Sequence, residues 1–279
     1  MTTAIIGIGL IGGSFALSLK DKGLVDKIIG VERDPTHQKR ALELGLVDEI
    51  MDLNDAVRKA DLVVLAIPVN MIIHILPSIL DMVEKGVIMD VGSTKHGILD
   101  IIKGHKNRSR FVATHPMWGT EYSGPEAAVH DAFVNKATVI CNRDESDNDA
   151  LALVEQVYKK IGMHLVYMQA DAHDVHVAYV SHISHITSFA LANTVLEKER
   201  EEDAIFELAS GGFESTVRLA KSNPDMWAPI FMENRENVLD VLNEHISQLR
   251  KFKACLEKEN YQYLQELMQQ ANKIKRIIK

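Results

Sequence analysis

The chain has 279 residues, of which 46% are hydrophobic and 25% charged, a balance typical of a globular protein with ample core material. A formal net charge of −8 argues against a general binder of nucleic acid or anionic membranes, because those surfaces need clustered cations. No apolar run reaches the ~20 residues that a bilayer-spanning helix requires. Cys141 and Cys255 are too few and too far apart for a disulfide framework, and no leader pattern precedes the first strand, so we expect a cytoplasmic protein.

The first predicted strand runs directly into a glycine-rich turn. The sequence TAIIGIGLIGGS holds a G-x-G-x-x-G pattern at Gly7, Gly9 and Gly12. In a dinucleotide site the first glycine forms the tight turn, the second lets the backbone approach a pyrophosphate, and the third allows close packing of helix on strand. The helix that begins at Leu10 and Ile11 would direct its N-terminal N–H groups at the phosphates.

A second predicted strand, residues 27–32, ends in Glu32, 20 residues after Gly12. A carboxylate at this position can accept hydrogen bonds from ribose hydroxyls and repels the 2′-phosphate of NADP. We therefore expect NAD as the cofactor, while Arg33 beside the carboxylate leaves NADP open. The alternative is a tight strand-to-helix turn that binds nothing.

Strands and helices go on alternating up to residue 168. Apolar strands are predicted over 61–68, 86–91, 110–114, 136–141 and 164–168, and helices over 34–44, 70–83, 94–102 and 147–161. Pro77 is expected to interrupt the helix over 70–83. Continuous apolar strands are typical of a parallel sheet that is buried on both faces. The pattern predicts an α/β fold, a Rossmann-type doubly wound and mainly parallel sheet, which binds ligands at the carboxyl ends of its strands.

Helices alone follow residue 168. We expect one long helix over 171–198, shorter helices, and then helices over 234–258 and 259–279. The change predicts a NAD-binding Rossmann domain over 1–168 and a helical substrate and dimerisation domain over 169–279. The helix over 234–258 carries a broad apolar face formed by Val238, Leu239, Val241, Leu242, Ile246 and Leu249. Such a face is usually buried against a partner, so we expect a homodimer.

Three residues at predicted strand ends could carry chemistry. His115 follows the strand over 110–114, where a histidine can reach a bound substrate and titrate near neutral pH. From position alone, a structural histidine under a loop explains it equally well. Ser93 and Lys95 follow the strand over 86–91 and could hydrogen-bond a substrate or the nicotinamide. Ser93 could equally be only the N-cap of the next helix.

Five motifs occur in order over nearly the whole chain. They are GSTK at 92–95, HPMWGTE at 115–121, VSHISH at 180–185, GGF at 211–213 and RLAKSNPDMW at 218–227. Together they resemble the TyrA-type family of prephenate and arogenate dehydrogenases. The resemblance implies oxidative decarboxylation of prephenate to 4-hydroxyphenylpyruvate in tyrosine biosynthesis, with NAD as acceptor, by an enzyme with a helical dimerisation domain.

The resemblance also implies roles for single residues. By the resemblance, His115 and Ser93 are the catalytic residues. His115 takes the proton of the ring hydroxyl as hydride leaves for the nicotinamide and carbon dioxide is lost, and Ser93 matches a polar position of the substrate pocket. Arg218 matches the family's carboxylate-binding arginine and could clamp the dianionic substrate bidentately, although an exposed helical arginine is the alternative. The other substrate positions are Thr120, Glu121, Ser181, His185 and Trp227. The sequence ESTV over 214–217 departs from the family pattern, so no ionic gate between Glu121 and that run is expected.

Four histidines on the long predicted helix invite a metal site. His173, His176, His182 and His185 form two pairs with i, i+3 spacing. At ~100° per residue the two pairs point to opposite sides of an α-helix, so we expect no metal there. We interpret His185 as a substrate contact and the other three as surface or packing residues.

Other functions stay open. Arogenate could replace prephenate as substrate, but His185 has no obvious acid beside it to pair an ammonium, which favours prephenate. A 3-hydroxyacid or imine reductase joins the same two domain types, and Lys221 close to Arg218 would be its general acid. A non-catalytic nucleotide-sensing protein would keep the glycine loop and Glu32 but would need neither His115 nor Arg218.

Overall fold

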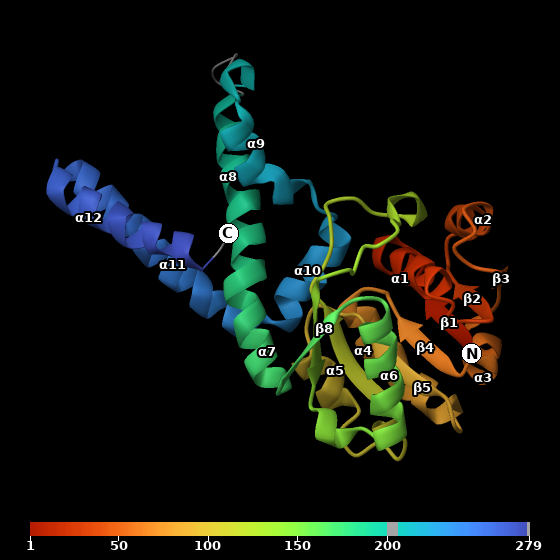
Figure 1. Cartoon of the computed structure of the whole chain (residues 1–279). Coiled ribbons are helices and arrows are strands. Elements are labelled where there is room, and N and C mark those ends of the chain that lie inside the picture. Colours follow the sequence, from red (N-terminus) through yellow and green to blue (C-terminus); the bar gives the residue numbers. More distant parts are fainter. Residues whose placement is uncertain (200–205, 278–279) are drawn as a thin grey trace. The chain divides into compact units, whose positions relative to one another are not determined.

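The computed structural model describes residues 1–199 and 206–277 (Figure 1). The chain forms two compact units, Met1–Asn234 and Arg235–Lys279. Among the described residues, no helix combines the length and the apolar character that crossing a membrane requires.

The first unit is built on a sheet whose strand order is β3-β2-β1-β4-β5-β6-β7-β8. The strands are β1 (Thr2–Ile6), β2 (Lys27–Val31), β3 (Glu49–Ile50), β4 (Leu62–Leu65), β5 (Val87–Asp90), β6 (Phe111–Pro116), β7 (Ala137–Cys141) and β8 (His164–Met168). Neighbours from β3 to β6 pair in parallel, β7 runs antiparallel to β6, and β8 is parallel to β7. The predicted doubly wound, mainly parallel sheet is confirmed.

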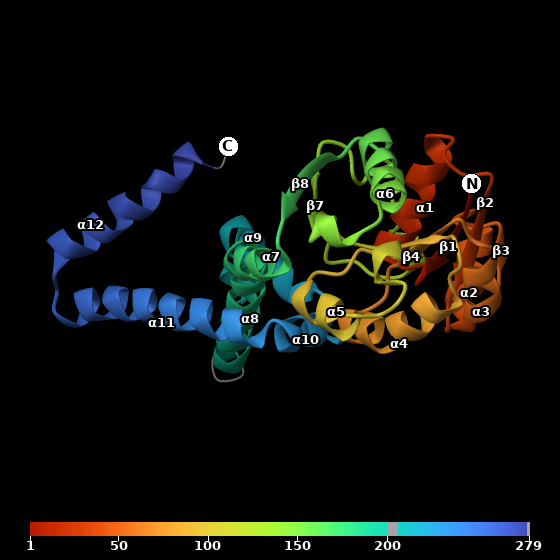
Figure 2. The ribbon, with the colours of Figure 1, turned by 90° about the horizontal axis from the view of Figure 1, so that it is seen from below.

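Helices cover both faces of this sheet. They are α1 (Leu10–Asp21), α2 (Pro35–Glu43), α3 (Leu53–Lys59), α4 (Val69–Met82), α5 (His96–Ile101) and α6 (Asn148–Lys160). Figure 2 shows α1 and α6 over one face and α3, α4 and α5 over the other. Successive residues of β1 follow this division, since Ala4 and Ile6 pack on the α4 side and Ile5 on the α1 side. Burial on both faces explains why the central strand β4, with the sequence LVVL, is apolar throughout.

The strand order reverses between β1 and β4, and such a switch point opens a crevice at the carboxyl ends of the strands. The glycine-rich turn after β1 lies there. Gly7 has φ of +90°, a backbone conformation that favours glycine. A Cβ atom at Gly12 would lie 2.0 Å from the carbonyl oxygen of Gly7, so glycine is needed for α1 to begin this close to β1.

The structure adds two elements between β2 and β4 that the sequence pattern did not indicate. β3 has two residues, too few to show any periodicity, and α3 is a seven-residue helix. α4 also differs from the expectation, because it continues through Pro77 to Met82 instead of being interrupted.

The predicted long helix over 171–198 is divided into three parts. α7 (Ala170–Val177) and α8 (Ile183–Glu199) are joined by a π-helical segment, Ala178–His182. A π-helical turn holds more residues than an α-helical turn, so an angle of ~100° per residue does not apply across it. The prediction that the two histidine pairs point to opposite sides assumed one continuous α-helix, and this assumption does not hold across Ala178–His182.

The first unit ends with α9 (Gly211–Val217), a 3₁₀ turn (Arg218–Lys221) and α10 (Pro224–Glu233). The side chain of Asn223 caps α10 by accepting from the backbone N–H of Asp225. Trp227 and Ile230 of α10 join the apolar cluster on the α4 side of the sheet, which fixes this helix to the α/β part. Further 3₁₀ turns lie at Arg108–Arg110, Pro125–Ala127, Arg143–Glu145 and Phe206–Leu208.

The second unit consists of α11 (Arg235–Glu257), α12 (Tyr261–Ala271) and a 3₁₀ turn (Asn272–Arg276). The helix predicted over 259–279 thus corresponds to α12 and this turn, and its residues 278–279 lie outside the described part of the chain. On the predicted apolar face of α11, Leu239 and Leu249 are exposed, at 43% and 55%. The unit therefore presents large apolar side chains at its surface.

Candidate active site

A cavity of about 430 Å³ lies at the carboxyl ends of β5 and β6. It brings together predicted residues from both halves of the first unit: Leu10, Ile11, Ser93, His115, Thr120, Ser181, His185, Arg218 and Trp227. A neighbouring cavity of about 210 Å³ is lined by Gly9, Leu10, Ile11, Ser93, Thr120 and Glu121, among others. The start of α1, at Leu10 and Ile11, and the candidate base His115 therefore line the same cavity.

The turn after β1 has the geometry that a dinucleotide needs. Gly9 is the N-cap of α1 and no side chain caps this helix end. A Cβ atom at Gly9 would meet nothing within 4 Å, so the approach to the backbone is open. Glu32 lies at the end of β2 and its carboxylate accepts from the N–H groups of Ile8, at 3.2 Å, and Arg33, at 2.7 Å. Helix N–H groups for a pyrophosphate and a carboxylate for ribose hydroxyls are thus present in one turn.

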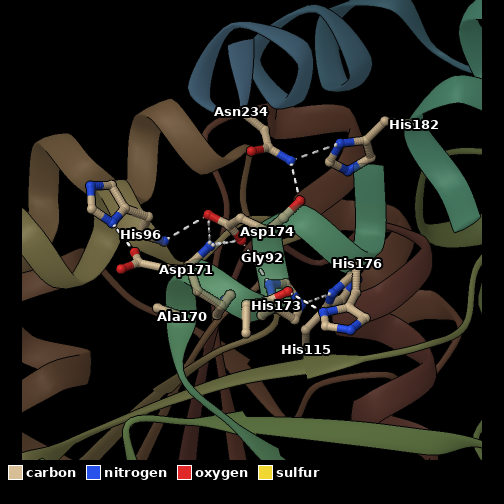
Figure 3. Close-up of polar contacts among 12 residues, drawn as sticks. Gly92, His96, His115, Ala170, Asp171, His173, Asp174, His176, His182 and Asn234 are labelled. Carbon is tan, nitrogen blue, oxygen red and sulfur yellow. Dashed lines mark hydrogen bonds and ion pairs between the residues drawn. The ribbon is translucent and has the colours of Figure 1, made fainter. Parts of the chain in front are cut away.

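His115 is half-buried and is the first member of a hydrogen-bonded chain that leads into the protein interior (Figure 3). Its Nδ1 atom lies 2.8 Å from Nε2 of His173, and Nδ1 of His173 lies 2.7 Å from the carboxylate of Asp174. A carboxylate only accepts, so Nδ1 of His173 carries the proton and Nε2 of a neutral His173 accepts from His115. The proton of neutral His115 is then on Nδ1, and its Nε2 atom is left with a lone pair.

Asp174 is fixed by donors from α5. Its carboxylate accepts from the backbone N–H groups of Lys95 and His96, each at 2.8 Å. The side-chain amide of Asn234 donates to the Asp174 backbone carbonyl at 2.7 Å. The orientation of His173, and through it that of His115, is therefore set by the beginning of α5.

The hypothesis that Lys95 contacts a substrate is wrong. The Lys95 side chain is fully buried, forms an ion pair with Asp90, and donates to the carbonyl of Thr114 at 2.7 Å. It connects the end of β5 with β6 and lines neither of the two cavities. Ser93 does line both cavities, and it is not the N-cap of α5, because that position is held by Lys95.

Burial is the main reason that the pKa of His115 lies well below its usual value of 6.5. Positive charge on His173, Lys95 or His182 also lowers the pKa of His115, because a like charge nearby disfavours its protonated form. A histidine held in this way is neutral near pH 7 and can accept a proton at once.

His185 and Trp227 form one wall of the larger cavity. Their rings are stacked with centroids 3.4 Å apart and an interplanar angle of 24°. Nδ1 of His185 donates to the carbonyl of Ser181 at 3.1 Å, so Nε2 is the free nitrogen. Burial, and then the charge of Arg218, lowers the pKa of His185. A neutral, oriented ring is thus presented to a ligand.

The three other helix histidines have different environments. His173 was expected to be a surface or packing residue, but it is buried and hydrogen-bonded to His115. His182 is buried against Trp227, and burial lowers its pKa to about 4. His176 is exposed. No group of three or more histidine, cysteine, aspartate or glutamate residues that could hold a metal ion is found in the described part of the chain.

Arg218, which lines the larger cavity, and Glu121, which lines the smaller one, form an ion pair at 2.8 Å. Glu121 comes from the loop after β6 and Arg218 from the 3₁₀ turn after α9. A hydrogen bond from its own backbone, and then the charge of Arg218, lowers the pKa of Glu121, so the carboxylate is ionised. The contact of Glu121 is with Arg218 itself, rather than with the run over 214–217. The Arg218 side chain remains 49% exposed, so it can also reach a ligand.

Lys221 does not have the position of a general acid. It is 59% exposed, its Nζ atom lies 3.8 Å from the carboxylate of Glu214, and it does not line the larger cavity.

A Rossmann sheet whose first helix begins at the cavity that holds a neutral, oriented histidine is the arrangement expected of a nucleotide-dependent dehydrogenase. Residues 15–167 match the family model for the nucleotide-binding domain of prephenate dehydrogenase, and residues 169–270 match the model for its dimerization domain. The chain belongs to the prephenate dehydrogenase family and is an NAD-dependent oxidoreductase.

Individual relatives agree with this assignment. The chain is 31% identical to a prephenate dehydrogenase of Bacillus subtilis, over 94% of this chain and 72% of that protein. A crystal structure of prephenate dehydrogenase from A. aeolicus in complex with hydroxyphenyl propionate and NAD+ has a TM-score of 0.87 and 32% identity, covering 99% of this chain and 97% of that one. The arogenate dehydrogenase of Synechocystis has a TM-score of 0.77 and 27% identity, covering 99% of both chains.

Proposed function

We propose that this enzyme oxidises and decarboxylates prephenate to 4-hydroxyphenylpyruvate with NAD as the acceptor. The observation that carries the proposal is the cavity that is lined both by Leu10 and Ile11, at the start of α1, and by His115, whose Nδ1 atom is engaged by His173. The names of the Bacillus subtilis and A. aeolicus relatives support the substrate. The reductase would use Lys221 as its general acid, but Lys221 does not line the larger cavity. The non-catalytic sensor would leave the hydrogen-bonded chain from His115 to Asp174 without a role.

His115 would act as the general base. Its Nε2 atom accepts the proton of the ring hydroxyl, while the bond from Nδ1 to His173 holds the ring in place. NAD supplies the hydride acceptor when bound at the glycine loop. Loss of the ring carboxylate as carbon dioxide leaves its bonding electrons in the ring, which becomes aromatic, and the phenolate oxygen takes the proton back from His115. Aromatisation drives the reaction, so the site has mainly to orient the substrate.

The other predicted residues would position the substrate. Arg218 offers a guanidinium to a carboxylate, and Ser93, Thr120 and Ser181 offer hydroxyl groups at the cavity wall. Trp227 and His185 provide a flat, partly apolar surface for a ring. Glu121 would hold Arg218 in place until a substrate carboxylate competes for it.

Prephenate is favoured over arogenate by the charges at the cavity. Arogenate carries an ammonium group where prephenate carries a keto group. The described residues that line the larger cavity include no aspartate or glutamate that would pair with an ammonium. Glu121 lines the smaller cavity and is already paired with Arg218.

We further propose a Rossmann domain over 1–168, a helical domain over 169–279, and a homodimer formed through the helical domain. The matched family ranges and the exposed apolar side chains of α11 support this organisation. A cytoplasmic location stays a prediction.

The proposal is tested by comparing substrates with the purified protein. NADH formation should be fastest with prephenate, slower with arogenate, and absent with small 3-hydroxyacids. A higher kcat/KM for arogenate would replace prephenate in this assignment. Turnover of hydroxyacids alone would favour a reductase.

Replacing Glu32 with alanine should weaken NAD binding. A charge-assisted hydrogen bond to ribose is worth roughly 1.5–3 kcal/mol, so we expect the KM for NAD to rise about 10- to 100-fold. The KM for NADP should change less, because the same carboxylate repels the 2′-phosphate. The control is Glu84→Ala, at an exposed glutamate that precedes β5 and so lies near the N-terminal ends of the strands, away from the cavity. Wild-type enzyme with a lower KM for NADP than for NAD would contradict the role of Glu32.

The pH profile of kcat/KM should reflect the lowered pKa of His115. The base works only when neutral, so activity is retained at neutral pH and is lost as the pH falls through the pKa of His115. Because burial holds that pKa well below 6.5, the acidic limb should lie below pH 6.5. A limb centred above pH 6.5 would show that His115 is not the neutral base described above.

A further inference from the structure

Lys136 lines the larger cavity because β7 is antiparallel to β6. In an antiparallel pair the start of one strand lies beside the end of the other. Pro116 pairs with Thr138, and the N–H of Met117 donates to the carbonyl of Ala137 at 2.8 Å. Lys136, which immediately precedes β7, is thereby placed beside the loop that follows His115. Had β7 been parallel to β6, this lysine would lie at the opposite edge of the sheet.

The backbone of Lys136 is held on both sides. Its N–H donates to the carbonyl of Phe133 at 3.1 Å, and its own carbonyl accepts from the N–H of His164 at 3.0 Å. Phe133 is fully buried. The lysine therefore extends from a fixed point of the sheet, even though its side chain is exposed.

Two of the described residues that line the larger cavity are lysine or arginine, namely Lys136 and Arg218. Arg218 is paired with Glu121, whereas the structure shows no ion pair or hydrogen bond of the Lys136 ammonium with any described residue. The described lining contains no carboxylate that could pair with Lys136. An unpaired ammonium at a cavity wall is a ready site for an anionic group.

We propose that Lys136 is a second carboxylate-binding residue, so that Lys136 and Arg218 each hold one of the two carboxylates of the substrate. The inference rests on the proposed function, which supplies a ligand with two negative charges. One cation comes from the sheet and the other from the helical part of the first unit, so a dianion would be held from two sides. The alternative is an ordinary solvated surface lysine.

The first test is the substitution Lys136→Met, which keeps the length of the side chain and removes its charge. A lost charge-assisted hydrogen bond should raise the KM for prephenate about ten-fold, with kcat and the KM for NAD little changed. Lys136→Arg should restore most of the binding. The matched control is Lys85→Met, the same substitution at an exposed lysine at the other edge of the sheet, and it should behave as wild type. An unchanged KM in Lys136→Met would overturn the proposal.

The second test uses the product, which keeps only the side-chain carboxylate. If each cation holds one carboxylate, only one of Lys136→Met and Arg218→Met should raise the inhibition constant of 4-hydroxyphenylpyruvate, while both raise the KM for prephenate. Equal effects of the two substitutions on product inhibition, or no effect of either, would overturn the division between them. Failure of the proposed function would look different, because the wild-type enzyme itself would form no NADH with prephenate.

Discussion

Replacing His115 with asparagine is expected to lower kcat by about 10²- to 10⁴-fold, the usual contribution of a positioned general base. The asparagine Nδ2 group can take over the donor role of His115 Nδ1 toward His173, so the buried chain to Asp174 is kept. What is removed is the Nε2 lone pair that would accept the substrate proton. The KM for prephenate should change much less than kcat, because the substitution leaves Arg218 and the remaining cavity wall in place.

The matched control for this substitution is His164→Asn, at an exposed histidine at the start of β8. It should retain wild-type kcat. Thermal unfolding of both variants shows whether the fold is kept. A His115→Asn enzyme with wild-type kcat would remove His115 from the role of base, whatever the substrate.

Replacing Arg218 with alanine is expected mainly to raise the KM for prephenate, by about 10- to 100-fold, since a hydrogen bond between ionised groups contributes roughly 1.5–3 kcal/mol. The substitution has a second effect, because the carboxylate of Glu121 loses its partner at 2.8 Å and repels an incoming dianion. The double variant Glu121→Gln/Arg218→Ala separates the two effects and should recover part of the binding.

The control for Arg218 is Arg143→Ala, at an arginine that is also 49% exposed but lies in the turn after β7. Its kinetic constants should match those of the wild type. If Arg218→Ala lowered kcat with an unchanged KM, the arginine would act in the chemical step instead of in substrate binding.

The α/β part of the fold could be predicted because its signals are local. The glycine turn, the apolar strands and the carboxylate at Glu32 each occupy a short stretch of sequence and have one physical explanation. Residues Ser93 and His115 could be placed at the same edge because parallel strands end together. β3 escaped prediction because two residues show no period.

The residues that hold the proposed base His115 in place could not be predicted from local sequence in the same way. His173 lies 58 residues from His115, and nothing in the spacing indicates that Nδ1 of His115 and Nε2 of His173 lie 2.8 Å apart. The adjacent residues His173 and Asp174 were a weak signal at best. The π-helical segment before α8 also made the predicted directions of the four helix histidines unreliable, because the rules that predict α-helices from sequence do not locate such a segment.

Lys95 and Lys136 also show that local sequence does not fix which lysine faces the cavity. Lys95 sits in a motif beside Ser93 and was expected to face the substrate, yet its charge is buried against Asp90. Lys136 belongs to no motif, and its place at the cavity depends on the antiparallel direction of β7. Strand direction at a sheet edge is a tertiary property that local sequence does not carry.

The most direct test of the account is the stoichiometry of prephenate turnover by the wild-type enzyme with NAD. We expect NADH, carbon dioxide and 4-hydroxyphenylpyruvate to appear in equal amounts, and NADH formation to be nearly abolished in His115→Asn. Absence of NADH formation with both prephenate and arogenate would contradict the proposed function.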